Sequence, residues 1–422
     1  MVPLNLSPLL LVSLFILSAA RSAFSYTCGF PYDSQKIRGV NLGGWLVLEP
    51  WITPTLFDVT GDSRIIDEYT YCQYQDKTKA AAALKVHWDT WITEQDFKDI
   101  AAAGLNHVRI PIGYWAFDVA SGEPWIQGQV AYLYKAIAWA QKYNLKIIVD
   151  LHGVPGSQNG FDNSGQKMNS PTWHLNATNV QRSNAVITKI ASQFKDMSGV
   201  IPAIAALNEP AGWYGTAMMN VVKQFWHDSY GNIRYPYGGD RTSNTVVIIS
   251  DAFQPASYWR GFMPAPRWDG VMLDTHIYQV FDNSLVRWSE DQHIKAACSR
   301  GPGLQESGLW TVVGEWSPAR TDCAKYLNGR GVGARYDGTY PGSSRVGSCA
   351  GFSGKAVTFS DSYKTFLRKF WEAQTKAYET ERGWIQWCWK AEQADEWSYQ
   401  AGLKNGWIPQ NPTNRLYPNI CN

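Results

Sequence analysis

Two glutamates stand where short apolar runs of the chain end. Glu209 comes after residues 204–207 and Asn208, and a proline follows it, while Glu315 ends a similar run, residues 310–314. Runs this short and apolar are typical of strands that are buried on both faces of a parallel sheet. Two carboxylates presented at the carboxyl ends of such strands could cleave a glycosidic bond. One can protonate the leaving oxygen while the other attacks the sugar or activates water.

These glutamates need a framework, and the rest of the chain predicts one. Eight stretches have the apolar character of buried strands, namely residues 36–42, 105–111, 145–152, 204–207, 245–250, 271–278, 310–316 and 383–390. Helical patterns lie between them, at residues 76–103, 131–143, 179–194, 218–229 and 362–380. Strands that alternate with helices predict the α/β class, and eight of them predict a single (β/α)8 TIM barrel.

A parallel barrel gathers the residues at its strand ends around one mouth. We expect that mouth to collect Glu49, Arg109, His152, Asn208, Glu209, His276, Tyr278, Glu315 and Trp387. Glu209 and Glu315 belong to the fourth and seventh strands, which face each other across the opening. No nucleotide-binding loop, HExxH or GxSxG motif supports a different chemistry. The pair is therefore a stronger signal than either glutamate alone, although two unrelated structural glutamates are the alternative.

Composition narrows the class of partner. The chain has 38 basic and 36 acidic residues and a net charge of +2, so neither nucleic acid nor an anionic membrane is expected as a partner. It also has 21 Trp and 22 Tyr among 422 residues. Many of these rings must lie in the core, but flat amphipathic rings also stack on the apolar faces of sugars. We expect no cofactor and no metal, and a monomeric protein.

The amino terminus predicts export. Residues 9–20 form an almost unbroken apolar run that is too short to span a bilayer, and small residues follow it before Tyr26. We expect residues 1–25 to be a signal peptide and residues 26–422 to form one secreted catalytic domain, extracellular or associated with a cell wall. Asn176 begins the Asn-Ala-Thr glycosylation sequon.

Seven cysteines suit an oxidising compartment, and their spacing contains no CxxC pair. Cys323 and Cys349 bracket much of a glycine-rich stretch, read as a long surface loop, and could pin it together. Cys298 with Cys421 could tie the carboxyl terminus to the barrel, but the sequence leaves both pairings open. An odd number of cysteines leaves at least one thiol unpaired, and we expect Cys388 to be that free thiol.

Four motifs together resemble one enzyme family. They are Ile-Arg-Gly-Val-Asn-Leu-Gly-Gly-Trp at residues 37–45, Ala-Leu-Asn-Glu-Pro at 206–210, His-Ile-Tyr-Gln-Val-Phe at 276–281 and Gly-Glu-Trp at 314–316. In this order they resemble glycoside hydrolase family 5, and within it the fungal exo-β-1,3-glucanase group. The resemblance implies a retaining mechanism with Glu209 as acid/base and Glu315 as nucleophile.

Physical chemistry suggests how neighbours would support that pair. Retaining carboxyl groups lie about 5–5.5 Å apart, so one is expected to stay ionised and the other to hold a proton. Arg109 could keep the nucleophile ionised through a charge-assisted hydrogen bond, and Tyr278 could donate to the same carboxylate. Asn208 suits the 2-hydroxyl of the sugar.

The resemblance also implies a substrate pocket. Glu49 would grip the hydroxyls of the terminal sugar, and Trp387 would floor the subsite of the cleaved sugar. Phe161 and Phe281 would frame the entrance. Three further residues of the pattern are Asp162, Asn163 and His152, and the resemblance gives His152 and His276 roles as partners of sugar hydroxyls.

The sequence thus predicts an exo-β-1,3-glucanase that acts on a β-glucan or β-glucoside and releases glucose from its non-reducing end. Three alternatives stay open. One keeps fold and mechanism but changes the sugar, as in a rutinosidase-type β-diglycosidase or a β-1,6-glucanase. A second is a non-catalytic glucan-binding barrel. A third is metal-dependent hydrolysis, for which the sequence offers no evident ligand cluster.

Overall fold

A closed barrel of eight parallel strands forms the centre of the protein, and the computed structural model describes it over residues 28–422. The strands are β1 (Ile37–Asn41), β2 (His107–Gly113), β3 (Lys146–Gly153), β4 (Ala203–Ala205), β5 (Val246–Ser250), β6 (Val271–Ile277), β7 (Trp310–Trp316) and β8 (Gly383–Gln386). Each pairs with the next, and β8 closes the barrel on β1, where Ile37 lies opposite Gly383. The predicted (β/α)8 barrel is confirmed. The expected signal peptide, residues 1–25, lies outside the described residues.

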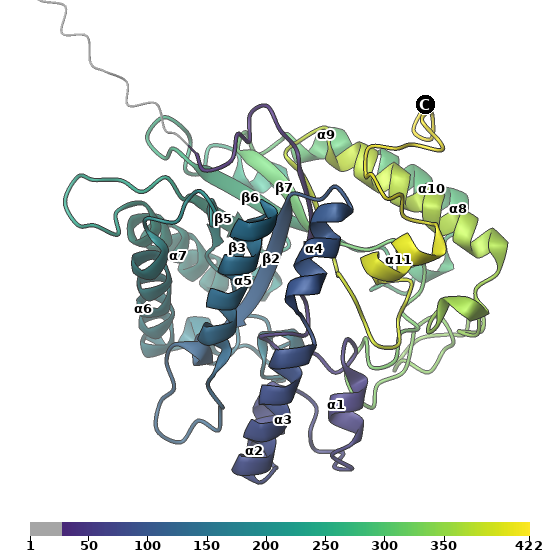
Figure 1. Ribbon diagram of the computed structural model, residues 1–422, viewed down its shortest axis with the longest axis horizontal. Coiled ribbons are helices and arrows are strands. Elements are labelled where there is room, and N and C mark those ends of the chain that lie inside the picture. Colours follow the sequence, from purple (N-terminus) through teal and green to yellow (C-terminus); the bar gives the residue numbers. More distant parts are fainter. Residues whose placement is uncertain (1–27) are drawn as a thin grey trace, which may run out of the picture.

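Helices surround the strands (Figure 1). They are α1 (Pro54–Asp58), α2 (Glu68–Gln73), α3 (Lys77–Thr90), α4 (Glu94–Ala102), α5 (Gln129–Tyr143), α6 (Ala177–Phe194), α7 (Thr216–Arg234), α8 (Glu290–Cys298), α9 (Arg300–Leu304), α10 (Asp361–Tyr378) and α11 (Tyr399–Asn405). In the part of the chain that the structure describes, none of them is long and apolar enough to cross a membrane.

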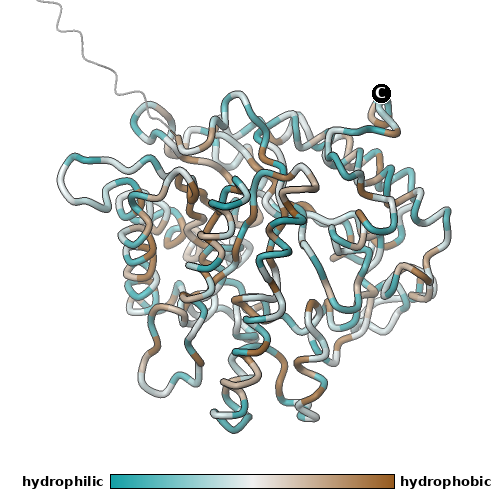
Figure 2. The backbone as a smooth tube through the Cα atoms, in the orientation of Figure 1, coloured by the Kyte–Doolittle hydropathy of each residue, from teal (hydrophilic) through white to brown (hydrophobic). Residues whose placement is uncertain are grey.

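The longer helices form because one face of each is apolar. In α10 the buried residues Tyr363, Phe366, Leu367 and Phe370 recur at helical spacing, and the Ser360 side chain caps the helix by accepting a hydrogen bond from the Tyr363 backbone. Such faces cover a core of buried strands. Hydrophobic stretches lie mainly in the interior and the outer loops are more hydrophilic (Figure 2).

The predicted strands agree closely with the observed ones, with two differences. β4 has only three residues, and its continuation toward Glu209 is already loop. β8 ends at Gln386, so Cys388 lies just beyond the strand that we expected to contain it. The sequence analysis also missed α8, whose capping box between Ser289 and Gln292 is a recognisable start signal.

Both cysteine pairings that the sequence left open are formed. Cys298 is bonded to Cys421, and Cys323 is bonded to Cys349. Cys388 is buried as a free thiol, as we expected, and Cys72 is a second one.

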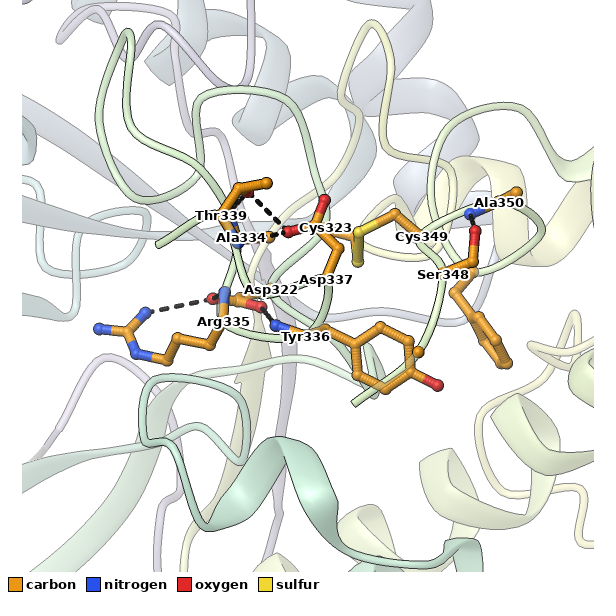
Figure 3. The surroundings of a disulfide bond; sticks show 12 residues. Asp322, Cys323, Ala334, Arg335, Tyr336, Asp337, Thr339, Ser348, Cys349 and Ala350 are labelled. Carbon is orange, nitrogen blue, oxygen red and sulfur yellow. Dashed lines mark hydrogen bonds and ion pairs between the residues drawn. A yellow bond between two sulfur atoms is a disulfide. The ribbon is translucent and has the colours of Figure 1, made fainter. Parts of the chain in front are cut away.

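The Cys323–Cys349 disulfide closes the base of the long loop between β7 and α10 (Figure 3). Inside this loop the buried Asp322 carboxylate accepts hydrogen bonds from the backbone N–H groups of Arg335 and Tyr336. Tyr326 attaches the loop to the start of the barrel, because its hydroxyl donates to Asp58 of α1 at 2.8 Å. The disulfide and these hydrogen bonds therefore hold the glycine-rich loop in a defined conformation.

Candidate active site

Glu209 stands on a short loop that neighbouring strands hold in place. The backbone N–H of Asn208 donates to the Leu151 carbonyl of β3, and the Gln158 side chain donates to the Asn208 carbonyl, both at 2.9 Å. Glu209 has a φ of 45°, in the left-handed region. A non-glycine residue keeps such a conformation only where its surroundings enforce it, which is common at active sites.

The two glutamates meet across the barrel mouth, as the sequence predicts. Glu315 lies within β7 and both side chains are buried. One oxygen of Glu209, one oxygen of Glu315 and a ring nitrogen of His276 all lie within 4.8 Å of one another. A separation of about 5 Å between carboxyl groups suits covalent attack and proton donation on a single sugar.

Arg109 is the centre of the charged network. It is the third residue of β2 rather than its last, and its guanidinium is buried inside the barrel. It donates to Glu315 Oε1 at 2.8 Å and to Asn208 Oδ1 at 2.7 Å. A second carboxylate, that of Asp150, lies 3.2 Å away. These anions raise the pKa of Arg109 further despite its burial, so the guanidinium is a permanent cation beside Glu315.

Tyr278 holds the other oxygen of the same carboxylate. Its hydroxyl donates to Glu315 Oε2 at 2.9 Å, as predicted. Burial raises the pKa of Tyr278, and the charges of Glu315 and Glu209 raise it further. The phenol therefore stays protonated and acts as a donor. Both oxygens of Glu315 thus have fixed donors that set the orientation of the carboxylate.

Two histidines are each supported by an aspartate two residues earlier. Residues i and i+2 of a strand point to the same side, and both β3 and β6 use this spacing. The Nδ1 atom of His152 lies 2.6 Å from Asp150, while Nε2 of His276 lies 3.5 Å from Asp274. The other ring nitrogen of His276, Nδ1, faces the glutamates and lies 2.8 Å from Glu209 Oε1.

The pKa values of His276, Glu209 and Glu315 depend on one another. Burial lowers its pKa, but the charges of Glu315 and Asp274 and the contact with Glu209 raise the pKa well above its usual range. Burial raises the pKa of Glu209, yet the His276 hydrogen bond and charge outweigh burial and bring it below the ordinary value. Burial raises the pKa of Glu315, against the opposing charges of His276 and Arg109.

The lowered pKa of Glu209 is opposite in direction to the shift that we expected for a carboxyl group that holds a proton. The expectation considered two carboxyl groups alone, whereas the site contains a cationic imidazole in contact with one of them. Nδ1 of His276 lies 2.8 Å from Glu209 Oε1, so a proton on this ring could reach Glu209 along one hydrogen bond. The other Glu209 oxygen accepts from the Asn163 amide at 3.0 Å.

Glu49 and Asp162 add two acceptors to the pocket. Oε1 of Glu49 and Oδ2 of Asp162 are buried and accept no hydrogen bond from the described residues, while Trp51 donates to the other Glu49 oxygen. Burial raises the pKa of Glu49 well above the usual range, and the nearby Asp162, Glu315 and Glu209 contribute to the rise. Burial raises the pKa of Asp162 to about 6. Sugar hydroxyls could donate to both atoms.

Aromatic rings complete the site. Trp387 is buried and stacks on the His152 ring, with centroids 5.6 Å apart and planes inclined by 11°. Phe161 and Phe281 are both exposed, at 42%. Phe281 packs edge-on against Tyr278, which itself holds Glu315. All the residues that the sequence analysis proposed for the mouth therefore lie in or beside one site.

Known proteins are similar to this chain in sequence. The cellulase family, glycosyl hydrolase family 5, matches residues 72–326. A glucan 1,3-beta-glucosidase of Blumeria graminis is 46% identical over 397 residues, which is 93% of this chain and 91% of that protein. A probable glucan 1,3-beta-glucosidase A of Aspergillus niger is 45% identical over 394 residues, or 93% and 92% of the two chains. The chain belongs to glycosyl hydrolase family 5.

A solved structure shares the family 5 fold. Rutinosidase from Aspergillus niger superposes with a TM-score of 0.70 at 20% identity, covering 90% of this chain and 99% of that one. At this identity the likeness concerns the barrel alone. The resemblance to fungal exo-β-1,3-glucanases that the motifs indicate is confirmed by the relatives named above.

One group of ligand-type side chains within residues 28–422 has metal-like spacing, and it is the Glu209–His276–Glu315 cluster of this family 5 site. Sequence analysis had found no such cluster. Its atoms already have donors: Arg109 and Tyr278 bond the two oxygens of Glu315, and Asn163 bonds Glu209. A metal would have to displace these donors and lie near the Arg109 cation. The donor set fits a hydrolytic carboxylate pair better than a metal.

Three buried partners in the family 5 site were missed from sequence. Asn41 bridges Arg109 and the Gly314 carbonyl, while Asp150 and Asp274 support the two histidines. The aspartates could have been found, because each precedes a predicted site histidine by two residues in a predicted strand. Asn41 had no comparable signal.

Proposed function

We propose that this protein is a retaining exo-β-1,3-glucosidase that releases glucose from the non-reducing end of β-1,3-glucans. The observation that carries the proposal is the meeting of Glu209 and Glu315 within 4.8 Å, with Arg109 and Tyr278 fixed on Glu315. The relatives named glucan 1,3-beta-glucosidase support the choice of linkage. The enzyme acts as a monomer and needs no cofactor.

In the first step Glu315 attacks the anomeric carbon of the terminal sugar. A bond forms between a carboxylate oxygen and that carbon while the bond to the glycosidic oxygen breaks. Glu209 delivers a proton to the departing oxygen. This proton comes along the 2.8 Å hydrogen bond from Nδ1 of His276, which is left neutral.

In the second step the roles reverse. Glu209 takes a proton from a water molecule and passes it back to Nδ1 of His276, while the water oxygen attacks the anomeric carbon of the glucosyl ester. The ester bond to Glu315 breaks, and glucose leaves with the configuration of the substrate retained. Arg109 and Tyr278 stabilise the Glu315 carboxylate that is released at this point, because both donate to it.

Glu49 and Asp162 favour exo action. The Glu49 oxygen without a donor is buried, and Glu49 lies near enough to Glu209, Glu315 and Asp162 for their charges to raise its pKa. The hydroxyls of a chain end could donate to the unpaired oxygens of Glu49 and Asp162. A chain that continued past the cleaved sugar would have no hydroxyl to offer at its linked position. We expect the pocket to accept a terminal glucose and to exclude an internal one, with Trp387 beneath the sugar ring.

Product analysis tests the proposal. Incubation with laminarin should release glucose as the first product, and NMR of the fresh product should show the β-anomer before mutarotation. Release of a disaccharide from rutin without glucose from laminarin would instead indicate a diglycosidase. Glucose from a β-1,6-glucan but not from laminarin would indicate a β-1,6-glucanase.

We also propose that the protein is secreted after removal of residues 1–25. The two disulfides support this proposal, because such bonds persist in oxidising compartments. Asn176 supports it as well, since the sequon lies exposed at the start of α6. Amino-terminal sequencing of protein from culture medium should begin at Tyr26.

A further inference from the structure

Trp397 is a buried ring next to the candidate active site. Its side chain is 1% exposed, and its indole N–H is shielded from solvent and donates to no partner within residues 28–422. The ring belongs to a hydrophobic cluster, distinct from the main barrel core, that also contains Trp51 and Trp387. Because this ring has no exposed polar atom to offer a sugar, it can act on the site only through the residues that it contacts.

Two of the rings that Trp397 contacts each hold a carboxyl group of the site. The Trp397 ring meets the Trp51 ring edge-on with centroids 5.0 Å apart, and it lies against the Tyr278 ring at 5.7 Å. Trp51 donates its indole N–H to Glu49 Oε2 at 2.9 Å. Tyr278 donates its hydroxyl to Glu315 Oε2, also at 2.9 Å. Because side chains in a close-packed interior restrain one another's rotamers, the Trp397 ring contributes to the orientation of both carboxyl groups.

Backbone hydrogen bonds fix Trp397 relative to the ends of β7 and β8. Its carbonyl accepts the Cys388 N–H at 3.1 Å, and the Cys388 carbonyl accepts the Tyr399 N–H at 2.9 Å. Trp387, which directly precedes Cys388, donates its N–H to the carbonyl of Trp316 at 2.8 Å. Trp316 in turn follows the proposed nucleophile in β7. The Trp397 ring is therefore carried by backbone that is bonded to the strand ends of the site.

The two carboxyl groups differ in how much they depend on these neighbours. The Trp51 N–H is the only hydrogen bond that the described residues give to the Glu49 carboxyl group, because the other Glu49 oxygen has no donor. Glu315 has another donor, Arg109, on its second oxygen. Loss of the Trp397 ring should therefore disturb Glu49 through its single donor and Glu315 through one of its hydrogen bonds.

We propose that Trp397 is a positioning residue that holds Glu49 and Glu315 in the relative arrangement that the reaction needs. In the proposed function, on which this inference rests, Glu49 accepts a hydroxyl group of the terminal sugar while Glu315 attacks its anomeric carbon. One sugar must make both contacts at the same time. A shift of about 1 Å in a reacting group can cost roughly 100-fold in rate, so a ring that restrains both carboxyl groups affects substrate binding and the chemical step together.

Kinetics of Trp397→Leu on a nitrophenyl β-glucoside test the inference, because this substrate reports hydrolysis whichever glucan linkage the enzyme prefers. The variant should lower kcat about 10-fold through the displaced Tyr278 hydroxyl, and raise KM roughly 3- to 10-fold through the displaced Glu49. Trp397→Phe keeps a ring at this position and should restore most of both constants. If Trp397→Leu does not fold, Trp397→Phe should show smaller changes of kcat and KM in the same directions.

Double variants separate positioning from a general loss of structure. Tyr278→Phe already lacks the hydroxyl that Trp397 positions, so adding Trp397→Leu should lower kcat further by less than about 2-fold. Trp51→Phe already lacks the donor to Glu49, so adding Trp397→Leu should leave KM nearly unchanged and still lower kcat. Independent, fully multiplicative effects of Trp397→Leu in both backgrounds would overturn the inference.

Trp407→Leu is the matched control. Trp407 is also 1% exposed, with a buried indole N–H that has no described partner, but its ring contacts Phe359 and lies outside the cluster of Trp397. This variant should lower the melting temperature as Trp397→Leu does, and change neither kcat nor KM. An equal loss of kcat in Trp407→Leu, or unchanged kcat and KM in Trp397→Leu, would overturn the inference. A wild type that cleaves the nitrophenyl glucoside but not laminarin would overturn the proposed linkage instead, and leave this comparison of variants intact.

Discussion

His107 and Arg109 lie two residues apart on β2 and are both buried, but they differ in charge. Arg109 is surrounded by carboxylates at the carboxyl end of the barrel and keeps its charge. His107 lies at the amino end, where its ring packs edge-on against Phe30 with centroids 4.5 Å apart. Burial, with a smaller effect from Lys146, lowers the pKa of His107 to about 3, so this ring is neutral.

The difference shows how one strand serves two purposes. At the amino end a polar ring is tolerated because it gives up its charge and packs as an aromatic group. At the carboxyl end a cation is tolerated because Glu315, Asp150 and Asn208 surround it. A substitution of His107, at the amino end, should therefore affect the stability of the fold. A substitution of Arg109, at the carboxyl end, should affect catalysis.

The largest effect is expected at the nucleophile. Glu315→Gln should reduce kcat on an aryl β-glucoside by about 10⁴-fold or more, because no covalent intermediate can form. The melting temperature should change little, since Gln keeps the size of the side chain. Glu306→Gln, at an exposed carboxylate, is the control. Retained activity in Glu315→Gln would reject the mechanism, and a protein inactive from the start would favour a glucan-binding barrel.

A slightly smaller loss is expected at the acid/base. Glu209→Ala should reduce kcat/KM on laminaribiose by about 10²- to 10⁴-fold, since an alkoxide must then leave without a proton. The loss should be far smaller on a dinitrophenyl glucoside, whose leaving group needs none. Azide should restore turnover of that substrate and yield the β-glucosyl azide, measured by NMR. An α-azide or no rescue would contradict the assignment.

At the amino end the effect should be on stability. His107→Gln should lower the free energy of unfolding by about 1–3 kcal/mol at pH 7 through lost aromatic packing, with kcat/KM unchanged. The folded pKa of about 3 lies below the unfolded value, so His107 stabilises the fold above pH 6.5 and this contribution is lost as pH falls toward 3. Urea unfolding at pH 7 and pH 4 measures both effects. The gap between wild type and variant should narrow at pH 4, and a gap that widened would contradict a neutral His107.

The smallest effect is expected at Asp274, which touches no substrate in the proposed reaction. Its carboxylate lies 3.5 Å from Nε2 of His276 and helps to raise the pKa of that ring. Asp274→Asn should lower the His276 pKa and move the basic limb of the kcat/KM profile toward lower pH. A pH profile from 3 to 9 checks this, and an unchanged basic limb would show that His276 does not supply the proton.

Sequence reasoning found the barrel because buried strands and strand-end residues have local signatures. Glu209 and Glu315 could be recognised from the apolar runs before them. The lowered pKa of Glu209 could not be predicted, because it depends on His276 lying 2.8 Å from Glu209, a contact between β6 and the loop after β4.

The Cys298–Cys421 disulfide determines what happens when a protease cuts the chain. The two cysteines are 123 residues apart, and the segment between them includes β7 with Glu315, the long loop of Figure 3 and Trp387. A single cut anywhere in that segment leaves two fragments joined by the disulfide. Nicked protein should therefore migrate as one band on a non-reducing gel and separate into two pieces only after a thiol reagent is added.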